Sequence, residues 1–205
     1  MTADSGDLRG KRRAILDAAA ALFASEGYAG TSMDALAARA NVSKATVYAH
    51  FSGKAELLGA VVRQLAGDFQ SPPEGLSSLS AAEGLRLFAR RFLDLILDER
   101  ALSTYRLVVA EARRFPEMAE TFHAVGPEVG LRTVAGYLGD LTRRGDLAVP
   151  DPELAAMLFL NMLKAGPHLP LLLGLPPGPV SPAAVIDEAV RVMLAAYAAP
   201  YCDGS

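Results

Sequence analysis

Residues 31–51 read TSMDALAARANVSKATVYAHF, and their pattern predicts two short helices joined by a tight turn. Apolar residues recur at a three-to-four-residue spacing in the first half, which predicts a helix that Thr31 caps and that carries Asp34 at its third position. After the turn, Ser43 is expected to cap a second helix that reaches about Phe51. Helix, turn and helix in this order are the layout of a helix-turn-helix.

The second of these helices is expected to bury one row of side chains and to leave the others outside. Val47 and Phe51 stand four residues apart and are apolar, so we expect them to face the core together with Val42. The other rows are small, polar or basic, and such a slim surface fits the major groove of DNA, which is about 12 Å wide. Candidate base contacts are Lys44, Ala45 and Thr46, and candidate phosphate contacts are Thr31, Ser32, Tyr48, His50 and Lys54.

A basic run, Lys11-Arg12-Arg13, lies upstream of this segment, at the start of a helix expected to end at Gly27. Lys11 and Arg12 are candidate contacts to the DNA backbone or to an adjoining minor groove. A solvated helix start explains the same run equally well. The whole pattern also fits any three-helix bundle, in which Tyr48 only covers the core.

Charge is unevenly distributed along the 205 residues. Residues 1–66 carry eight Lys or Arg and six Asp or Glu, a net charge of +2, whereas the whole chain carries −3. A cationic N-terminal part favours contact with nucleic acid through that part. Ordinary scatter of surface charge accounts for the same difference, and on charge alone it is the simpler interpretation.

Composition excludes several other classes of protein. Hydrophobic residues make up 51% of the chain, too many for a disordered tail. A lone cysteine, Cys202, can form neither an internal disulfide nor a cysteine-based zinc site, so we expect a reducing, cytoplasmic location. Met1–Gly10 lacks the apolar core of a secretory signal, and polar residues, Gly and Pro interrupt the most apolar stretch, Leu154–Leu175, so no membrane partner is expected.

Apolar residues keep the helical spacing along the rest of the chain without strand-like alternation, so an all-α fold is predicted. The Pro- and Gly-containing segment 71–75 marks the first strong break. We therefore divide the chain into an N-terminal three-helix helix-turn-helix domain at 1–53, a connecting helix at 54–70 and a C-terminal helical bundle at 71–205. The roles of ligand sensing and dimerisation for this bundle come from the family resemblance given below. Further helices are expected at about 81–98, 101–114, 117–124, 127–144, 151–164 and 181–198, with a loop at about 166–179.

A dense set of positions between residues 12 and 62 carries a family resemblance. They are Ile15, Ala18, Ala19, Phe23, Gly27, Tyr28, Thr31, Ser32, Ala37, Ala40, Val42, Ser43, Tyr48, His50, Phe51, Lys54, Leu57 and Leu58. With these residues the segment resembles the N-terminal DNA-binding domain of the TetR/AcrR family of bacterial transcriptional regulators. Carried over by position, the family's phosphate contacts are Thr31, Ser32, Tyr48, His50 and Lys54, and the residues nearest the bases are Lys44, Ala45 and Thr46. Ala49 departs from the aromatic residue often found at its position in the family.

The resemblance implies an all-helical homodimer with two DNA-reading heads and a ligand-sensing body. It also implies a pseudo-palindromic double-stranded DNA operator, bound most often for repression. In the body, residues 107–117 resemble a C-terminal subtype of the family, and residues 151–156 resemble the start of a dimer-forming helix. Helices at 151–164 and 181–198 are rich in small and apolar residues, so we expect them to meet their symmetry mates.

Such a regulator needs a ligand that prefers one of two states, and helical bundles commonly hold ligands between their helices. We expect a small-molecule effector that is apolar or amphiphilic. Candidate ligand contacts are Phe88, Phe92, Tyr105, Val109, Phe122, His123, Phe159 and Met162. An aromatic residue or Met at helical spacing is more often core than pocket, so a purely structural role for each stays open.

Motifs for an enzyme are missing from the sequence. His50, His123 and His168 are far apart and form no zinc-binding pair, and neither a glycine-rich nucleotide loop nor a nucleophile elbow is found. We therefore predict no catalytic site, no metal and no cofactor. A helical interaction protein, or a helical-bundle enzyme without sequence-specific DNA binding, is the alternative.

Overall fold

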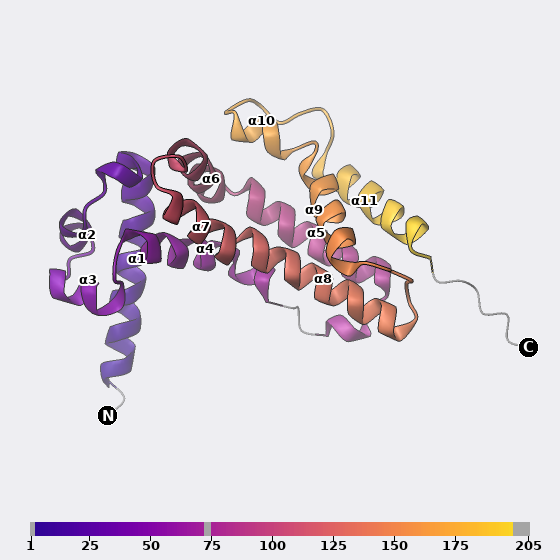
Figure 1. Ribbon diagram of the computed structural model, residues 1–205, viewed down its shortest axis with the longest axis horizontal. Helices are drawn as coiled ribbons and strands as arrows, with labels where there is room; N and C mark the ends of the chain where they lie inside the picture. The colour runs from indigo at the N-terminus through magenta and orange to yellow at the C-terminus, as the bar shows by residue number, and fades with distance from the viewer. Residues whose placement is uncertain (1–2, 72–74, 199–205) are drawn as a thin grey trace, which may run out of the picture. The chain divides into compact units, whose positions relative to one another are not determined.

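The computed structural model describes residues 3–71 and 75–198, and the regular elements in that part of the chain are helices (Figure 1). The predicted all-α fold class is therefore confirmed. Within these residues, β-pairing is limited to an isolated antiparallel bridge between Leu147 and Ala198. The elements are α1 (Ala3–Gly30), α2 (Met33–Arg39), α3 (Lys44–His50), α4 (Lys54–Gln70), η1 (Leu76–Ser78), α5 (Ala81–Leu97), α6 (Glu99–Glu111), α7 (Pro116–Val125), α8 (Pro127–Arg144), α9 (Pro152–Lys164), α10 (His168–Leu172) and α11 (Pro182–Ala196).

Contacts divide the chain into two compact units. The head unit comprises the residues up to Ala66 together with Glu99–Pro127, and the body unit comprises Gly67–Asp98 together with the residues from Glu128 onward. The limits drawn from the sequence followed chain order and assigned α6 and α7 to the C-terminal part. Their contacts instead group these two helices with α1–α3 and most of α4.

The head unit is built around the apolar face of α1. Ile15, Ala19 and Phe23 are buried there, in one cluster with apolar residues of α2, α3, α4, α6 and α7. The ring of Tyr28 stacks on Phe23 with 5.6 Å between centroids and meets Phe115 edge-on at 5.0 Å. Because Phe115 lies between α6 and α7, this contact ties the α6–α7 segment to the last turn of α1.

Gly27 interrupts α1 at the position where the sequence predicts a helix end. Its φ of 73° and ψ of 173° are non-helical, and glycine adopts such a positive φ without a Cβ clash. Helical hydrogen bonding resumes after it, so that α1 continues to Gly30. Tyr28, directly after the interruption, is buried in the head core.

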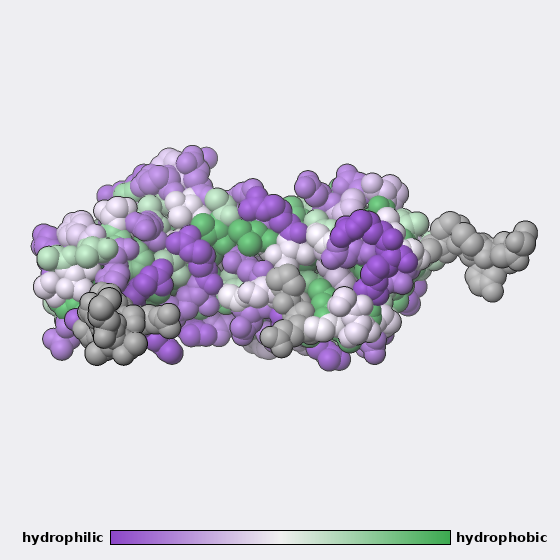
Figure 2. Space-filling view, turned by 90° about the horizontal axis from the view of Figure 1, so that it is seen from below, coloured by the Kyte–Doolittle hydropathy of each residue, from purple (hydrophilic) through white to green (hydrophobic). Residues whose placement is uncertain are grey.

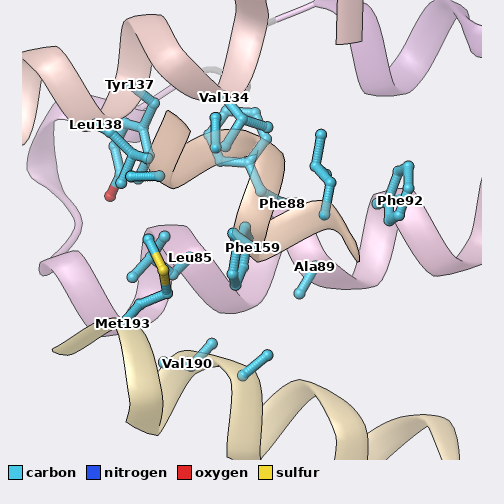
Figure 3. Packing of buried hydrophobic residues seen from close by; sticks show 14 of the residues in the cluster. Leu85, Phe88, Ala89, Phe92, Val134, Tyr137, Leu138, Phe159, Val190 and Met193 are labelled. Atoms are coloured by element: carbon cyan, nitrogen blue, oxygen red, sulfur yellow. The ribbon is translucent and has the colours of Figure 1, made fainter. Parts of the chain in front are cut away.

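The body unit has its own core, formed where α5, α8, α9 and α11 face one another (Figure 3). Phe88 and Phe159 lie at its centre and are fully buried. Asp151 and Ser181 cap α9 and α11, each with a proline at the first helical position. The Asp151 carboxylate accepts from the backbone N–H of Leu154 at 3.0 Å.

One close approach between α5 and α8 depends on a glycine. A Cβ at Gly84 would lie 1.8 Å from the hydroxyl oxygen of Tyr137, so a larger residue does not fit without displacing the ring. That hydroxyl is buried, and it has no hydrogen-bond partner among the described residues. Phe88 packs against the same ring at 5.1 Å between centroids. Packing alone therefore holds Tyr137.

The segment between α9 and α11 corrects one expectation, because it contains a short helix where a loop was predicted. Pro170 is the third residue of this helix, α10. Backbone N–H groups in the first turn of a helix have no helical acceptor, so a proline there costs no hydrogen bond. The glycines and prolines around it suggested a loop, yet they only set the ends of α10.

Hydrophobic as well as hydrophilic residues reach the molecular surface on the face drawn in Figure 2. On α9 the exposed hydrophobic side chains are Leu154, Met157 and Leu158, which share one face at helical spacing. Leu169 on α10 and Leu173 directly after it are exposed as well. Among the described residues, no helix is both long enough and apolar enough to cross a membrane.

Candidate nucleic-acid interface

The start of α2 corrects the predicted cap by one residue. Ser32 is the N-cap, and its Oγ accepts from the backbone N–H of Ala35 at 3.1 Å. Thr31 is only 3% exposed, and its hydroxyl donates to the carbonyl of Gly27 at 2.8 Å. A phosphate cannot reach a hydroxyl that is buried and already bonded, so we remove Thr31 from the candidate contacts. Ser32 is exposed at the α2 N-terminus, where backbone N–H groups favour an anion.

The turn between α2 and α3 is tight because one residue takes a left-handed conformation. Asn41 has a φ of 53°, which asparagine tolerates better than most residues. Val42 is partly buried against the head core, as predicted. Ser43 then caps α3, accepting from the backbone N–H of Thr46 at 3.0 Å. The predicted helix-turn-helix layout is therefore present.

The side chains of α3 separate into a buried row and an outer surface. Val47 and Phe51 are 0% and 2% exposed, so the row expected to face the core does so. Outside this row, the exposed residues of the helix are Lys44, Ala45, Tyr48 and Ala49, while Thr46 and His50 are partly exposed. A helix whose outer surface is this narrow can enter the major groove without steric obstruction.

Two of the candidate base contacts already interact within the head unit. The Oγ1 of Thr46 lies 2.8 Å from the Oγ of Ser43, so its hydroxyl is held by the cap. The ammonium of Lys44 lies 2.7 Å from Oδ1 of Asp34 on α2, and both side chains are exposed. The hydrogen bond and the negative charge of Asp34 raise the pKa of Lys44. This pair was not predicted from the sequence, because Asp34 was assigned to the cap of its own helix.

Lys54, a candidate phosphate contact, also holds the head unit together. Its ammonium donates to the carbonyl of Tyr28 at 2.7 Å. It also lies over two aromatic rings, 4.8 Å from the centroid of Tyr28 and 5.9 Å from that of Phe115. An ammonium has three N–H groups, so this arrangement leaves two donors for a phosphate.

The basic run near the start of α1 lies beside the end of α3. The guanidinium of Arg12 is stacked over the Phe51 ring at 5.3 Å from its centroid, and Arg12 is exposed. Lys11 is partly buried, and the neighbouring Arg13 pairs with Asp17 at 4.0 Å. Arg12 is therefore the member of the run that is both exposed and fixed next to α3.

The eight candidate ligand contacts are divided evenly between the two units. In the body unit, Phe88, Phe92 and Phe159 are buried in the core and Met162 packs against it, which is the structural role that the sequence left open. In the head unit, Tyr105 and Phe122 meet edge-to-face at 6.0 Å between centroids, whereas Val109 is 62% exposed and His123 is exposed. Neither unit alone gathers the full set.

Metal binding finds no support in the described residues, since no three His, Cys, Asp or Glu side chains group together to hold an ion.

Comparisons with known proteins agree with this architecture in both parts of the chain. Residues 15–61 match the family model of bacterial regulatory proteins of the tetR family, and residues 83–199 match the C-terminal domain of AefR-like transcriptional repressors. The HTH-type transcriptional repressor Rv3405c of Mycobacterium tuberculosis is 36% identical over 167 residues, which are 78% of this chain and 79% of the relative. The HTH-type regulator YhgD of Bacillus subtilis is 31% identical over 161 residues, covering 74% and 80%.

Solved structures give the same result. The Flavonoid-responsive Regulator FrrA is 31% identical, with a TM-score of 0.74 over 94% of this chain and 98% of that one. A TetR transcriptional regulator from Agrobacterium tumefaciens is 26% identical, with a TM-score of 0.74 over 91% and 94%.

Proposed function

Since the chain belongs to the TetR family of bacterial transcriptional regulators, we propose that it is a homodimeric repressor that binds a pseudo-palindromic operator in double-stranded DNA. A small apolar or amphiphilic effector releases it from that operator, and it acts in the cytoplasm. Relatives bearing the family's helix-turn-helix are regulators rather than enzymes.

The outer surface of α3 is the observation that carries this proposal. Ala45 and Ala49 are small, so the helix axis can approach the base edges closely. Lys44 is long enough to reach the O6 and N7 acceptors of guanine, and the Thr46 methyl suits the methyl group of thymine. Tyr48 is 49% exposed, and we propose that its hydroxyl contacts a phosphate.

Phosphate contacts fix the head on the duplex. Ser32 at the start of α2 supplies a hydroxyl, and Arg12 of α1, held over the Phe51 ring at the end of α3, supplies a fixed positive charge. We propose His50 and Lys54 as further phosphate contacts, and Lys11 as a contact to the DNA backbone or to an adjoining minor groove. Such contacts strengthen binding to every sequence and carry no base information.

The proposed palindromic operator requires a twofold dimer, and the body unit has a surface that could form one. The exposed face of α9 that holds Leu154, Met157 and Leu158 is an apolar surface that a twofold partner would cover. Ala155 of α9 and Met193 of α11 belong to the two helices expected at the interface, but they are buried in the core of their own protomer and are not available to a partner. Two heads related by a twofold axis would read half-sites about 34 Å apart.

Release by the effector requires that the ligand prefers the conformation that does not fit the operator. The coupling free energy for such ligands is typically about 1–3 kcal/mol per coupled site. FrrA, a solved structure that this chain resembles, is named as flavonoid-responsive, which is consistent with an effector that has an apolar ring system. A saturating effector that leaves operator affinity unchanged would contradict release for that ligand.

Selection of bound duplexes from a random pool tests the function directly. We expect an inverted-repeat consensus, and binding that weakens steeply as salt rises from about 50 to 200 mM because phosphate contacts release counterions. The variant Lys44→Ala should alter or weaken the consensus, whereas Arg132→Ala, an exposed cation on α8, should leave it unchanged. If folded protein enriches no sequence even in dilute salt, the proposal is wrong and an interaction protein or enzyme is favoured.

A further inference from the structure

Lys164 is a cation in an unusual place. It is the last residue of α9, and its side chain is partly buried beside the core of the body unit. Its ammonium lies 5.9 Å from the centroid of Phe92, a ring of α5 that is 6% exposed. The two residues before it in the core, Phe159 and Leu163, are fully buried.

Within the described residues, the ammonium of Lys164 has no carboxylate partner and makes no hydrogen bond, and it lies over the Phe92 ring. Several other cations of the body unit pair with a carboxylate, as Arg132 does with Glu128 and Arg191 with Glu188. Burial lowers the pKa of Lys164, as expected for a charge removed from water without an anion nearby. A cation–π contact offsets only part of that desolvation cost.

The groups around Lys164 determine which charge on a ligand would be complementary to this site. Burial, and then the positive charge of Lys164, lower the pKa of His168 below its ordinary value of 6.5, which disfavours a second positive charge beside Lys164. The ammonium of Lys164 is therefore the positive charge that a ligand would meet here. One negative charge balances it, whereas a doubly charged phosphate group would leave an uncompensated anion in a partly buried place.

We propose that Lys164 binds the carboxylate of an amphiphilic effector, whose apolar part lies against the apolar side chains around Phe92. This inference rests on the proposed ligand-responsive function and narrows the effector from any apolar or amphiphilic molecule to a monoanionic one. A charge-assisted hydrogen bond from the ammonium to the carboxylate replaces the water that Lys164 has lost. The apolar part contributes through buried surface area.

The alternative is that the helix C-terminus and the Phe92 ring satisfy Lys164 sufficiently. The negative end of the α9 dipole favours a cation there. That interpretation predicts no preference among ligands that differ only in their head group. The two explanations are therefore separated by comparing matched ligands.

Binding of decanoate, decan-1-ol and acetate to the full-length protein, measured by isothermal titration calorimetry, makes this comparison. We expect decanoate to bind about tenfold or more tightly than decan-1-ol, because only decanoate pairs with the ammonium. Acetate should bind more weakly than decanoate because it lacks the apolar part. Equal affinity for decanoate and decan-1-ol, or for decanoate and acetate, would overturn the proposal.

Substitutions assign the preference to Lys164. Lys164→Met should abolish the preference for decanoate and should raise the melting temperature of the ligand-free protein, because an unpaired charge is removed from a partly buried site. Lys164→Arg should retain the preference. Arg90→Met removes the same charge from an exposed position on α5 and is the matched control, which should behave as wild type. A Lys164→Met variant that still prefers decanoate contradicts the proposal.

A titration followed by NMR gives a readout independent of affinity. The sequence contains four lysines, Lys11, Lys44, Lys54 and Lys164, so the Cε signals of labelled lysine are few enough to assign. Decanoate should raise the pKa of Lys164, because a bound anion favours the ammonium, and should leave that of Lys44 unchanged. Operator binding is measured on the same preparations, so a protein that binds DNA but shows no head-group preference refutes this inference alone.

Discussion

The ammonium of Lys44, at the start of α3, lies 2.7 Å from Oδ1 of Asp34 on α2. The residue proposed to read a base is thus paired with an acid of the same helix-turn-helix before DNA arrives. Both side chains are exposed, so solvent screens the pair and Lys44 can leave Asp34 at little cost. Asp34 nevertheless places a negative charge at a surface that must approach phosphates.

Asp34→Asn should therefore strengthen DNA binding, by roughly two- to tenfold at low salt, because it removes repulsion of the phosphates and frees Lys44. Fluorescence anisotropy with the selected operator and with an unrelated duplex would measure the change. Glu26→Gln, which removes an exposed acid from α1 in the same unit, is the charge-matched control and should have a smaller effect. Weaker binding by Asp34→Asn would mean that Asp34 instead holds Lys44 in its base-reading position.

Thr46 allows a methyl contact to be separated from a hydroxyl contact. Its hydroxyl is held by Ser43, so we expect its methyl group to make the contact with the base. Thr46→Val should retain sequence preference, whereas Thr46→Ser should relax it at one position in each half-site, by about 1–3 kcal/mol. Selection from a random pool with each variant measures this. The opposite ranking of the two variants would assign the contact to the hydroxyl.

Lys54 should matter for both stability and DNA binding. Lys54→Ala loses the bond to the Tyr28 carbonyl and the contacts with two aromatic rings, so we expect the free energy of unfolding to fall by about 1–2 kcal/mol. If Lys54 also contacts a phosphate, the variant binds all sequences more weakly and the salt slope drops by about one unit. Urea denaturation and a salt titration measure the two effects separately. A loss of stability with an unchanged slope would restrict Lys54 to its structural role.

Parts of this interface could be predicted because they depend on local geometry. Val47 and Phe51 share a face of any α-helix, whatever surrounds it, so their burial followed from spacing alone. The Asp34–Lys44 pair could not be predicted, because it joins two helices across a turn whose angle is not encoded in residue spacing. Thr31 was mistaken for the cap because it and Ser32 are both good N-cap residues, and only the backbone conformation distinguishes them.

Packing between segments that are far apart in the sequence could not be predicted. Chain order gave no reason to group α6 and α7 with the head unit, and the ring contact of Phe115 with Tyr28 joins residues far apart in the sequence. The sequence could not show which candidate ligand contacts belong to a core, because a phenylalanine at helical spacing gives the same pattern in a core as in a pocket. Only the burial of Phe88, Phe92 and Phe159 in the structure assigns them to the core. Lys164 had no motif at all, and only its position above Phe92 distinguished it.

Gly84 and Tyr137 form a coupled pair in the body unit. Gly84→Ala should lower the free energy of unfolding by about 1–3 kcal/mol, because the new Cβ would overlap the tyrosine hydroxyl. Tyr137→Phe should be neutral or stabilising, since the buried hydroxyl has no partner to lose. The double variant should recover part of the loss, because the ring carbon that remains is also close. Strictly additive effects in urea denaturation would show that the two residues do not contact each other as described.

Glu56 links the start of α4 to acid stability. The backbone N–H and the hydroxyl of Ser52 both donate to its Oε2 at 2.7 Å. These hydrogen bonds, the backbone one first, lower the pKa of Glu56 below its ordinary value of 4.5. Because the folded-state pKa lies below the unfolded one, the stabilisation is fully present above pH 4.5 and is lost as pH falls through the folded-state pKa.

Glu56→Gln should therefore flatten the acid branch of the stability curve without altering its slope near pH 7. Ser52→Ala removes one of the two donors and should give an intermediate curve, since the backbone N–H remains. Urea denaturation midpoints between pH 7 and pH 3 provide the measurement, and the difference between wild type and variant isolates this carboxylate from others that titrate in the same range. A difference that stays constant below pH 4.5 would mean that Glu56 has the same pKa in the folded and unfolded chains, and that the Ser52 bonds do not persist in solution.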